Sequence, residues 1–310
     1  MPNGESLVSP LTAADLKRAV SLLLPIAKST KEPSLVLDVG ALRAYSLGLS
    51  ASVVVPGERS AAVGFRSAFV TSALAGLSGP LTVTADAKHV TLADETTRAQ
   101  VAVSGVPDPI GPLADVLGSI VGPASALTTW LSRAYAAIAP DDNRYGLNGA
   151  HIDLKGAPLA VATDGNRLHV SELAGAAVTG AWPRIRYEAT EKRSAYHQDA
   201  LIPRAALSTL LAMLRRATGE VCLSWSAKEL HATCSAGWLR CRLLEAVYPD
   251  WRQVVPSMFK RTADVDRDAL LKAIRRIAWA ARDTSTTIRA AFHQGAVDLS
   301  TSNQDGAAAS

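Results

Sequence analysis

The same order of helix and strand patterns recurs along the 310-residue chain. An amphipathic helix is predicted at 12–28, where Leu16 and Leu23 lie on one face, and segments of alternating polarity follow it. A helical pattern of the same kind restarts at Leu127, 111 residues after Leu16. This periodicity indicates a duplicated domain.

Each of the first two units is predicted to hold two helices and a set of strands. In the first unit the second helix covers 66–77, and the strands lie at 34–38, 42–47, 50–55, 81–85, 88–92 and 98–104. In the second unit the helices cover 126–139 and 204–216, with a three-stranded meander over 144–170 and strands at 220–226, 229–234 and 237–245. A third unit begins with a helix near Asp268 and continues with strands near 287–292 and 296–300.

These elements predict three domains joined by two linkers. We expect a first domain at 1–106, a second at 125–247 and a partial third at 267–310. The linkers are 107–124, which is rich in glycine and proline, and 248–266. The third unit is expected to be about half present, without its second helix and closing strands.

Composition sets broad limits on the function. Hydrophobic residues make up 48% and charged residues 19%, and charges or prolines interrupt every apolar run before it reaches the length of a membrane span. The N-terminus lacks a secretory signal, so a cytoplasmic location is expected. The three cysteines, Cys222, Cys234 and Cys241, favour reduced thiols in the core. A net charge of +4 permits a polyanionic partner.

Residues 144–170 form the most informative stretch. The run Arg144-Tyr145-Gly146-Leu147-Asn148-Gly149 precedes two alternating segments, and Asp164-Gly165 is predicted to supply the positive-φ pair of a tight hairpin. On pattern alone, such a meander is compatible with any β-rich domain.

The identities of the residues in this stretch are more specific than the strand pattern. The first run, followed by Ala162-Thr163-Asp164-Gly165-Asn166-Arg167-Leu168 and then by Tyr248-Pro249-Asp250-Trp251-Arg252-Gln253-Val254-Val255-Pro256, resembles the bacterial DNA polymerase III sliding clamp (beta subunit) family. The resemblance implies an α+β fold of tandem clamp domains, each an antiparallel sheet with two helices that line a central hole. It also implies a homodimeric ring that encircles duplex DNA without sequence specificity and tethers polymerases and the clamp loader. An alternative is a clamp-derived regulator or decoy that binds the clamp loader or a clamp protomer without encircling DNA.

Basic residues on the predicted helices are candidates for contacts with DNA phosphates. For each of them alone, a solvated surface charge is the competing interpretation, and Lys31 is added only by the family resemblance. The set is Lys17, Arg18, Lys28, Lys31, Arg133, Arg215, Arg216, Lys272, Arg275, Arg276 and Arg282.

The resemblance also implies a cleft that binds short peptides from partner proteins. Two positions depart from the family pattern, since Asn166 and Gln253 stand where other members have His and Arg, and the opposite wall belongs to final strands that we do not expect in this chain. Ordinary packing of the meander and linker is the alternative. The matching residues are Leu147, Thr163, Gly165, Asn166, Arg167, Leu168, Pro249, Gln253 and Val254.

Ring closure in the family joins the last strand of the first domain to the first helix of the third. The matching surfaces are expected to be Val101 and Val103 on one side and Trp279, Ala280 and Ala281 on the other. Trp279 would have to supply most of the buried apolar area.

No catalytic constellation is present in the sequence, so no enzymatic activity, cofactor or metal is expected. Glycine-rich phosphate loops and nucleophile motifs are absent, and His231, Cys234 and Cys241 do not have the spacing of a zinc site. The segment 174–200 is rich in charged and aromatic residues, and is interpreted as a solvated insertion or as an extra contact to DNA or a partner.

Overall fold

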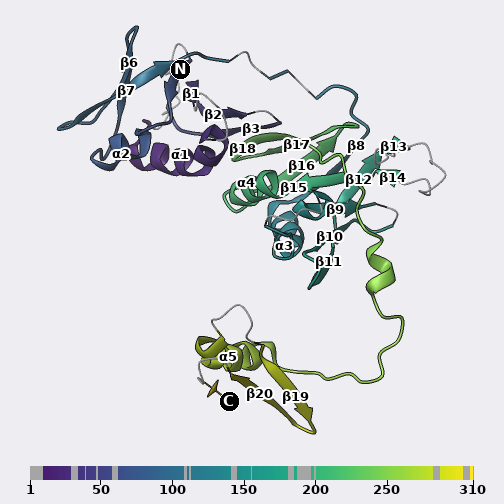
Figure 1. Cartoon of the computed structure of the whole chain (residues 1–310). Helices are drawn as coiled ribbons and strands as arrows, with labels where there is room; N and C mark the ends of the chain where they lie inside the picture. The colour runs from purple at the N-terminus through teal and green to yellow at the C-terminus, as the bar shows by residue number, and fades with distance from the viewer. Residues whose placement is uncertain are drawn as a thin grey trace, which may run out of the picture. The chain divides into compact units, whose positions relative to one another are not determined.

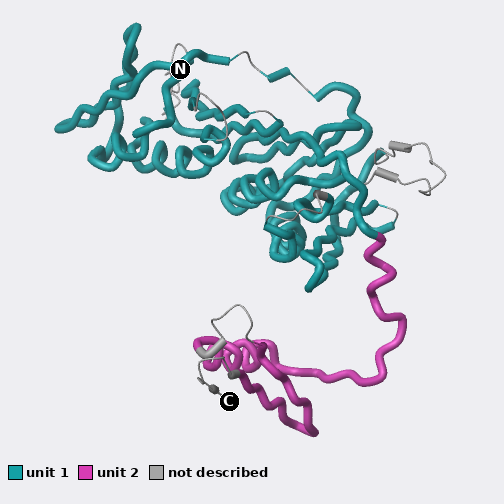
Figure 2. Tube along the Cα trace, viewed as in Figure 1, with its two compact units in different colours: residues 1–249 teal, residues 250–310 magenta. Residues whose placement is uncertain are grey.

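The chain, shown whole in Figure 1, divides in the computed structural model into two compact units, residues 1–249 and residues 250–310 (Figure 2). The structure describes residues 10–28, 34–38, 40–46, 48–57, 62–107, 110–111, 113–140, 145–154, 156–180, 185–186, 197–198, 200–281, 287–302 and 308–309.

The first repeat of unit 1 begins with helix α1 (Ala13–Lys28). The hydroxyl of Thr12 accepts a hydrogen bond from the Asp15 amide at 3.2 Å and donates to the Asp15 carboxylate at 2.6 Å, which caps the helix start. The remaining elements are β1 (Ser34–Asp38), β2 (Ala41–Ser46), β3 (Leu49–Val54), β4 (Val63–Arg66), α2 (Val70–Ala75), β5 (Thr82–Ala85), β6 (His89–Ala93) and β7 (Arg98–Ser104).

The second repeat has the same order with insertions. Its helices are α3 (Ala124–Tyr135) and α4 (Arg204–Leu214), each preceded by a proline in an extended conformation. The other elements are β8 (Gly118–Pro123), the 3₁₀ helix η1 (Tyr145–Asn148), β9 (Gly149–Asp153), β10 (Leu159–Thr163), β11 (Leu168–Glu172), β12 (Ala177–Gly180), β13 (Ile185–Arg186), β14 (His197–Gln198), β15 (Ala200–Pro203), β16 (Glu220–Trp225), β17 (Glu229–Cys234) and β18 (Gly237–Arg242).

Backbone hydrogen bonds confirm the duplication that the sequence predicts. The amide of Ala13 at the start of α1 donates to Gly79 at 2.9 Å, and the amide of Ala124 at the start of α3 donates to Gly219 at 3.0 Å. Strand β4 pairs antiparallel with β1, and β15 pairs antiparallel with β9. The two repeats therefore share their hydrogen-bonding scheme as well as their order of elements.

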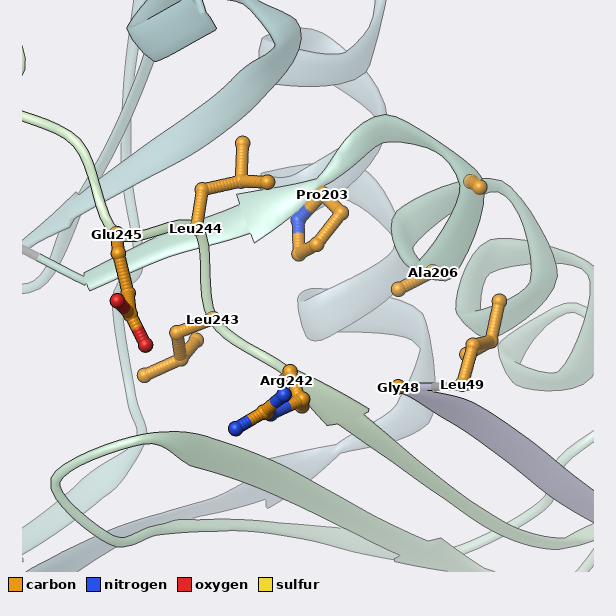
Figure 3. Close-up of a pocket in the computed structure, with 9 residues that line it drawn as sticks. Gly48, Leu49, Pro203, Ala206, Arg242, Leu243, Leu244 and Glu245 are labelled. Carbon is orange, nitrogen blue, oxygen red and sulfur yellow. The ribbon is translucent and has the colours of Figure 1, made fainter. Parts of the chain in front are cut away.

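The two repeats are joined by strand pairing. Strand β18 of the second repeat pairs antiparallel with β3 of the first, with Leu239 opposite Ala51, and both side chains are buried. The result is a twelve-stranded sheet in the order β12-β8-β16-β17-β18-β3-β2-β1-β4-β7-β6-β5, beside a four-stranded sheet β11-β10-β9-β15. A cavity of about 460 Å³ lies at this junction (Figure 3).

The predicted linker at 107–124 is wrong in its second half, because Gly118–Pro123 forms β8 between β12 and β16. A Cβ atom at Gly118 would lie 2.5 Å from the carbonyl oxygen of Thr179 and 2.7 Å from the ring of Trp225. Glycine is therefore required by close neighbours in the sheet, which the sequence does not distinguish from a flexible linker.

Three further expectations need correction. The helix predicted at 66–77 is only α2, because Val63–Arg66 pairs with β1 as a strand and buries Phe65. In the hairpin after β10 only Gly165 has a positive φ, of 88°, and Asp164 does not. Within the expected loop 174–200, Ala177–Gly180 forms an edge strand and Ala200–Pro203 a paired one, while 181–184, 187–196 and 199 lie outside the described residues.

Unit 2 contains one α-helix, two 3₁₀ helices and three strands in its described residues. Its helix α5 (Arg267–Ile277) is capped by Asp266, whose carboxylate accepts from the Ala269 amide at 2.6 Å. The other elements are the 3₁₀ helices η2 (Trp251–Val254) and η3 (Ala278–Ala281) and the strands β19 (Arg289–His293), β20 (Ala296–Ser302) and β21 (Ala308–Ala309). Among the described helices of both units, none is long and apolar enough to cross a bilayer.

Candidate nucleic-acid interface and partner site

Four helices of unit 1 form a continuous row, which we call the helix row: α2, α1, α4 and α3. Helix α1 contacts α2 on one side and α4 on the other, and α4 contacts α3. The row runs along one side of the sheets (Figure 1), with α1 packed on β1, β2 and β3 and α3 on β10 and β11. The duplicated domain thus places its helices on a shared surface.

The helix row carries almost no negative charge. Asp15 is the only acidic side chain in α1, α2, α3 and α4, and it lies 3.9 Å from the guanidinium of Arg18. Lys28 and Arg133 lie in the last turns of their helices, and Arg215 and Arg216 follow the end of α4. The negative end of each helix dipole stabilises a cation at these positions. The row is therefore electropositive.

The basic candidates differ in how available they are. Arg18, Lys28, Arg133, Arg215 and Arg216 are exposed. Lys17 is half-buried, and its ammonium donates to the carbonyl of Leu77 at 2.9 Å, so it also ties α1 to the segment after α2. In unit 2, exposed side chains extend from α5 at Lys272, Arg275 and Arg276. Lys31 and Arg282 lie outside the described residues.

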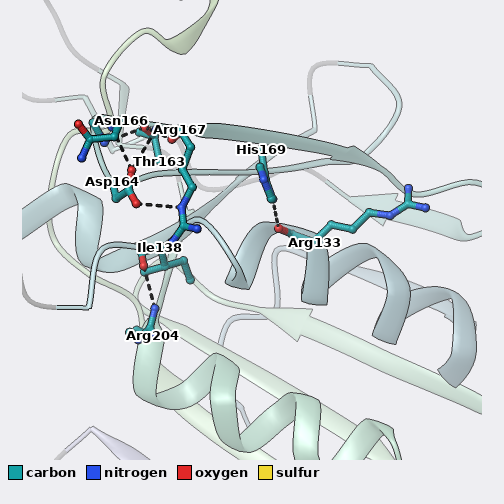
Figure 4. A network of polar contacts seen from close by, with 9 residues as sticks. Arg133, Ile138, Thr163, Asp164, Asn166, Arg167, His169 and Arg204 are labelled. Atoms are coloured by element: carbon teal, nitrogen blue, oxygen red, sulfur yellow. Dashed lines mark hydrogen bonds and ion pairs between the residues drawn. The ribbon is translucent and has the colours of Figure 1, made fainter. Parts of the chain in front are cut away.

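Sequence reasoning missed Arg204, which fixes α4 against α3. Its guanidinium donates to the carbonyl of Ile138 at 2.8 Å (Figure 4) and lies 4.7 Å from the centroid of the Tyr135 ring. A cation in the first turn of a helix interacts unfavourably with the helix dipole. The position of Arg204 at the start of the helix could therefore have predicted that it has a tertiary partner.

A second polar contact ties α3 to β11. The Nδ1 atom of His169 donates to the carbonyl of Arg133 at 2.7 Å, because a carbonyl oxygen can only accept (Figure 4). This bond holds the backbone of Arg133 while its side chain remains exposed. The end of α3 is therefore fixed to the meander that carries the predicted partner residues.

Local hydrogen bonds shape the hairpin between β10 and β11. The Thr163 hydroxyl donates to the carbonyl of Arg167 at 2.6 Å and accepts from the Gly165 amide at 3.0 Å. The Asp164 carboxylate accepts from the amides of Asn166 and Arg167, and these two backbone bonds are the main reason that its pKa is lowered. Its other oxygen accepts from the Arg167 Nε at 2.9 Å (Figure 4).

The two sequence motifs that suggested the family meet in space. A Cβ atom at Gly146 would lie 2.7 Å from the carbonyl oxygen of Val247, so the backbones approach closely there. The ring of Tyr248 stacks on His151 of β9, with centroids 4.9 Å apart. Burial raises the pKa of Tyr248. These contacts anchor the segment before Pro249 to the meander.

The predicted partner residues are brought together only in part. Thr163, Gly165, Asn166, Arg167 and Leu168 form one hairpin, of which Gly165, Asn166 and Arg167 are exposed and Leu168 is half-buried. Leu147 is buried in η1. Pro249 is exposed at the end of unit 1, whereas Gln253 and Val254 belong to unit 2, where Gln253 donates to the Asp250 carboxylate at 3.1 Å.

The predicted ring interface is wrong for the two valine side chains. Val101 is 5% exposed and belongs to the core of its own repeat, and Val103 packs against that core. Strand alternation instead exposes Arg98, Gln100 and Ala102. Trp279 is 53% exposed but lies in η3 beyond the end of α5, and the side chains of Ala280 and Ala281 lie outside the described residues.

The cysteines occupy both faces of the sheet. Cys241 is fully buried, and burial raises its pKa to about 12, so its thiol stays protonated near neutral pH. His231 is adjacent in β17 to Leu230, the partner of Cys241, and therefore points to the opposite face. Within the described residues there is no group of three side chains suited to a metal ion.

Known proteins are similar to this chain in sequence. Residues 123–250 match the family described as DNA polymerase III beta subunit, central domain. The beta sliding clamp of Synechococcus elongatus is 26% identical over 249 residues, which cover 79% of this chain and 63% of that protein. The beta sliding clamp of Caulobacter vibrioides is 24% identical over 174 residues, covering 54% of this chain and 43% of that protein.

Residues 123–250 are therefore similar to the central domain of the bacterial DNA polymerase III beta subunit, the sliding clamp. The chain spans about half the length of the first curated sliding clamps that it matches.

Solved sliding clamps have the same fold. The Thermotoga maritima beta subunit has a TM-score of 0.75 at 18% identity, and the alignment covers 96% of this chain and 81% of that one. The Bartonella birtlesii clamp, solved with griselimycin bound, has a TM-score of 0.72 at 18% identity over 96% and 82%. The predicted α+β fold of tandem clamp domains is thereby confirmed.

Proposed function

We propose that the protein is a DNA sliding clamp, a processivity factor without enzymatic activity that acts on duplex DNA in the cytoplasm. The observation that carries this proposal is the helix row, where exposed cations are accompanied by a single acidic residue, Asp15. A surface of this kind binds the phosphate backbone regardless of sequence, which is what a mobile tether requires.

The charge on the helix row can be tested by reversing it. We expect the triple variant Lys28→Glu, Arg215→Glu, Arg216→Glu to bind a fluorescent DNA duplex more weakly than wild type. The slope of log affinity against log salt should also become shallower by about 2 to 3, since each phosphate contact contributes about 0.9. Fluorescence anisotropy at several salt concentrations measures both quantities.

A matched control reverses the same number of charges elsewhere. Lys88→Glu, Lys228→Glu, Arg289→Glu changes exposed residues of strands and strand loops and leaves the helix row intact. This control should keep most of the wild-type salt slope. Equal loss in both triple variants would show that net charge, and not the helix row, governs DNA binding.

We further propose that the β10–β11 hairpin forms one wall of a cleft for partner peptides from polymerases and the clamp loader. Half-buried Leu168 at the start of β11 and the exposed rim at Asn166 and Arg167 support this assignment. A fluorescent peptide with aliphatic side chains should bind wild type more tightly than Leu168→Asp. Val170→Asp is the matched control, because Val170 is an exposed apolar residue of the same strand. Equal affinity of all three proteins would reject the assignment.

We propose that the protein assembles as a homodimeric ring. The exposed side chains of β7, which are Arg98, Gln100 and Ala102, and the exposed Trp279 are the surfaces of this chain that would take part. Light scattering after size exclusion should give a mass near twice 32.5 kDa. A strict monomer that does not bind circular DNA would instead favour the regulator that occupies a clamp loader or a clamp protomer.

A further inference from the structure

The cavity at the junction of the two repeats has no role in the proposed function so far. It is an open cleft of about 460 Å³, within the usual range for sites that hold small ligands or side chains (Figure 3). It lies where the β2–β3 turn of the first repeat meets the start of α4 and the end of β18. Its lining comprises Gly48, Leu49, Pro203, Ala205, Ala206, Arg242, Leu243, Leu244 and Glu245.

The cleft has a mixed lining, with aliphatic side chains in its walls and charged groups at its rim. Leu243, Leu244 and Ala206 are buried, and Leu49 and Pro203 are half-buried. Arg242 and Glu245 are exposed and carry opposite charges, so the rim has no net charge. Because Glu245 would repel a phosphate, this lining favours apolar side chains over a nucleotide or DNA.

The cleft walls are held by the backbone. The Arg242 amide donates to the carbonyl of Gly48 at 2.8 Å, and the Leu244 amide donates to the carbonyl of Leu201 at 2.9 Å. A Cβ atom at Gly48 would lie 3.4 Å from the Arg242 side chain, and Gly48 has a φ of 91°. The cleft is therefore formed before any ligand binds, which reduces the entropic cost of binding.

The internal duplication gives this cleft a counterpart. Leu49 is the first residue of β3, and Leu168 is the first residue of β11, each after the hairpin turn of the equivalent meander. At β3 the opposite wall is supplied by the following repeat, through α4 and β18. The junction of the repeats is therefore a site of the same construction with both of its walls present in unit 1.

We propose that this junction is a second peptide-binding cleft, which takes a short extended segment of a partner protein with two neighbouring aliphatic side chains. The inference rests on the proposed function for the class of ligand, a partner peptide. The aliphatic side chains fill the space over Leu49, Ala206 and Leu243, and polar groups of the segment meet Arg242 and Glu245.

Photo-crosslinking of the full chain tests this site. The probe is an acetylated pentapeptide with photo-leucine at its second and fourth residues, and crosslinked segments are identified by mass spectrometry. Wild type should crosslink within 203–206 and 242–245. Ala205→Trp adds a ring at an exposed lining position, and should reduce these crosslinks about tenfold by filling the cleft. Ser208→Trp, also exposed and on the same helix but outside the lining, should leave them unchanged.

Leu168→Asp separates this inference from the proposed function. It should abolish crosslinks at 163–168 and keep those at 203–206 and 242–245. The inference is overturned if wild type gives no crosslinks at the junction, or if Ala205→Trp leaves them as strong as Ser208→Trp does. If wild type crosslinks at 203–206 and 242–245 but not at 163–168, this result would count against the first cleft and support the junction.

Discussion

Helix α1 of the first repeat and helix α5 of unit 2 begin in the same way but are buried to different extents. Leu16 and Leu270 are each the fourth residue of their helix, and both helices place apolar residues on one face. Leu16 is fully buried, whereas Leu270 is half-buried, and Ile277 is the only buried residue of α5. The amphipathic pattern predicts α1 and α5 equally well, but it does not determine how deeply each helix is buried.

The difference follows from what each helix packs against. Helix α1 contacts β1, β2 and β3 as well as α2 and α4. Within the described residues of unit 2, α5 packs on β20 and η3. Leu270 and Ala273 line a cavity of about 530 Å³ together with Phe292, Val297 and Leu299, and Phe292 is 59% exposed. Within the described residues, unit 2 thus forms its helix and strands and leaves the apolar face of α5 partly open.

The largest expected effect concerns the paired leucines. Leu16→Ala should destabilise unit 1 by about 2–5 kcal/mol, because it leaves a cavity in a packed core. Leu270→Ala should cost unit 2 less than about 1 kcal/mol, since solvent already reaches that side chain. Hydrogen exchange with mass spectrometry across a urea series resolves α1 from α5. Similar costs at the two positions would contradict the comparison.

An intermediate effect is expected at two equivalent hairpins. An ion pair spans β1 and β2 between Asp38 and Arg43 at 2.9 Å, and between β19 and β20 His293 lies 3.1 Å from Asp298, a contact that is ionic only when His293 is protonated. The first pair is half-buried and the second is mostly exposed. Asp38→Asn should therefore cost about 1 kcal/mol, and Asp298→Asn no more than about 0.5.

The same hydrogen-exchange series measures both hairpin variants. Asn is uncharged and has nearly the same size as Asp. The change in the free energy of unfolding therefore reports the charge interaction and not packing. A larger cost for Asp298→Asn than for Asp38→Asn would show that exposure does not govern the strength of these pairs.

The smallest effect is a pH dependence confined to the second half of the first repeat. Asp94 closes the β6–β7 hairpin, and its pKa is lowered to about 2, first by the Ser78 amide and then by the amides of Thr96 and Thr97. Because the folded pKa is depressed from 3.8, its stabilising contribution is present above about pH 4 and is lost as the pH falls through about 2.

Carbon-13 NMR of the Asp94 carboxyl group measures this titration directly. The midpoint should lie near 2 in wild type. Ser78→Pro removes the first amide donor and should move the midpoint upward toward 3.8. An unchanged midpoint in that variant would show that the Ser78 bond is not the main cause.

Much of the fold could be predicted from local pattern. The spacing of Leu16 and Leu127 predicts the duplication, and the meander before Leu168 follows from alternation and turn residues. The linker prediction failed at Gly118 because a glycine that makes room for neighbouring strands has the same local sequence signal as a flexible one. Val101 was assigned to the ring interface because strand alternation predicts that its side chain is buried. The pattern does not show whether it is buried in the core of its own repeat or at an interface.

The sequence by itself determined most of the elements, their repeated order and the resemblance to a family, since these depend on side-chain periodicity and on motifs of neighbouring residues. The tertiary structure alone decided that β3 joins β18, that α2, α1, α4 and α3 share one electropositive face, and that a cleft opens between Leu49 and Leu243. These features depend on contacts between residues far apart in the chain, and local periodicity carries no information about such contacts.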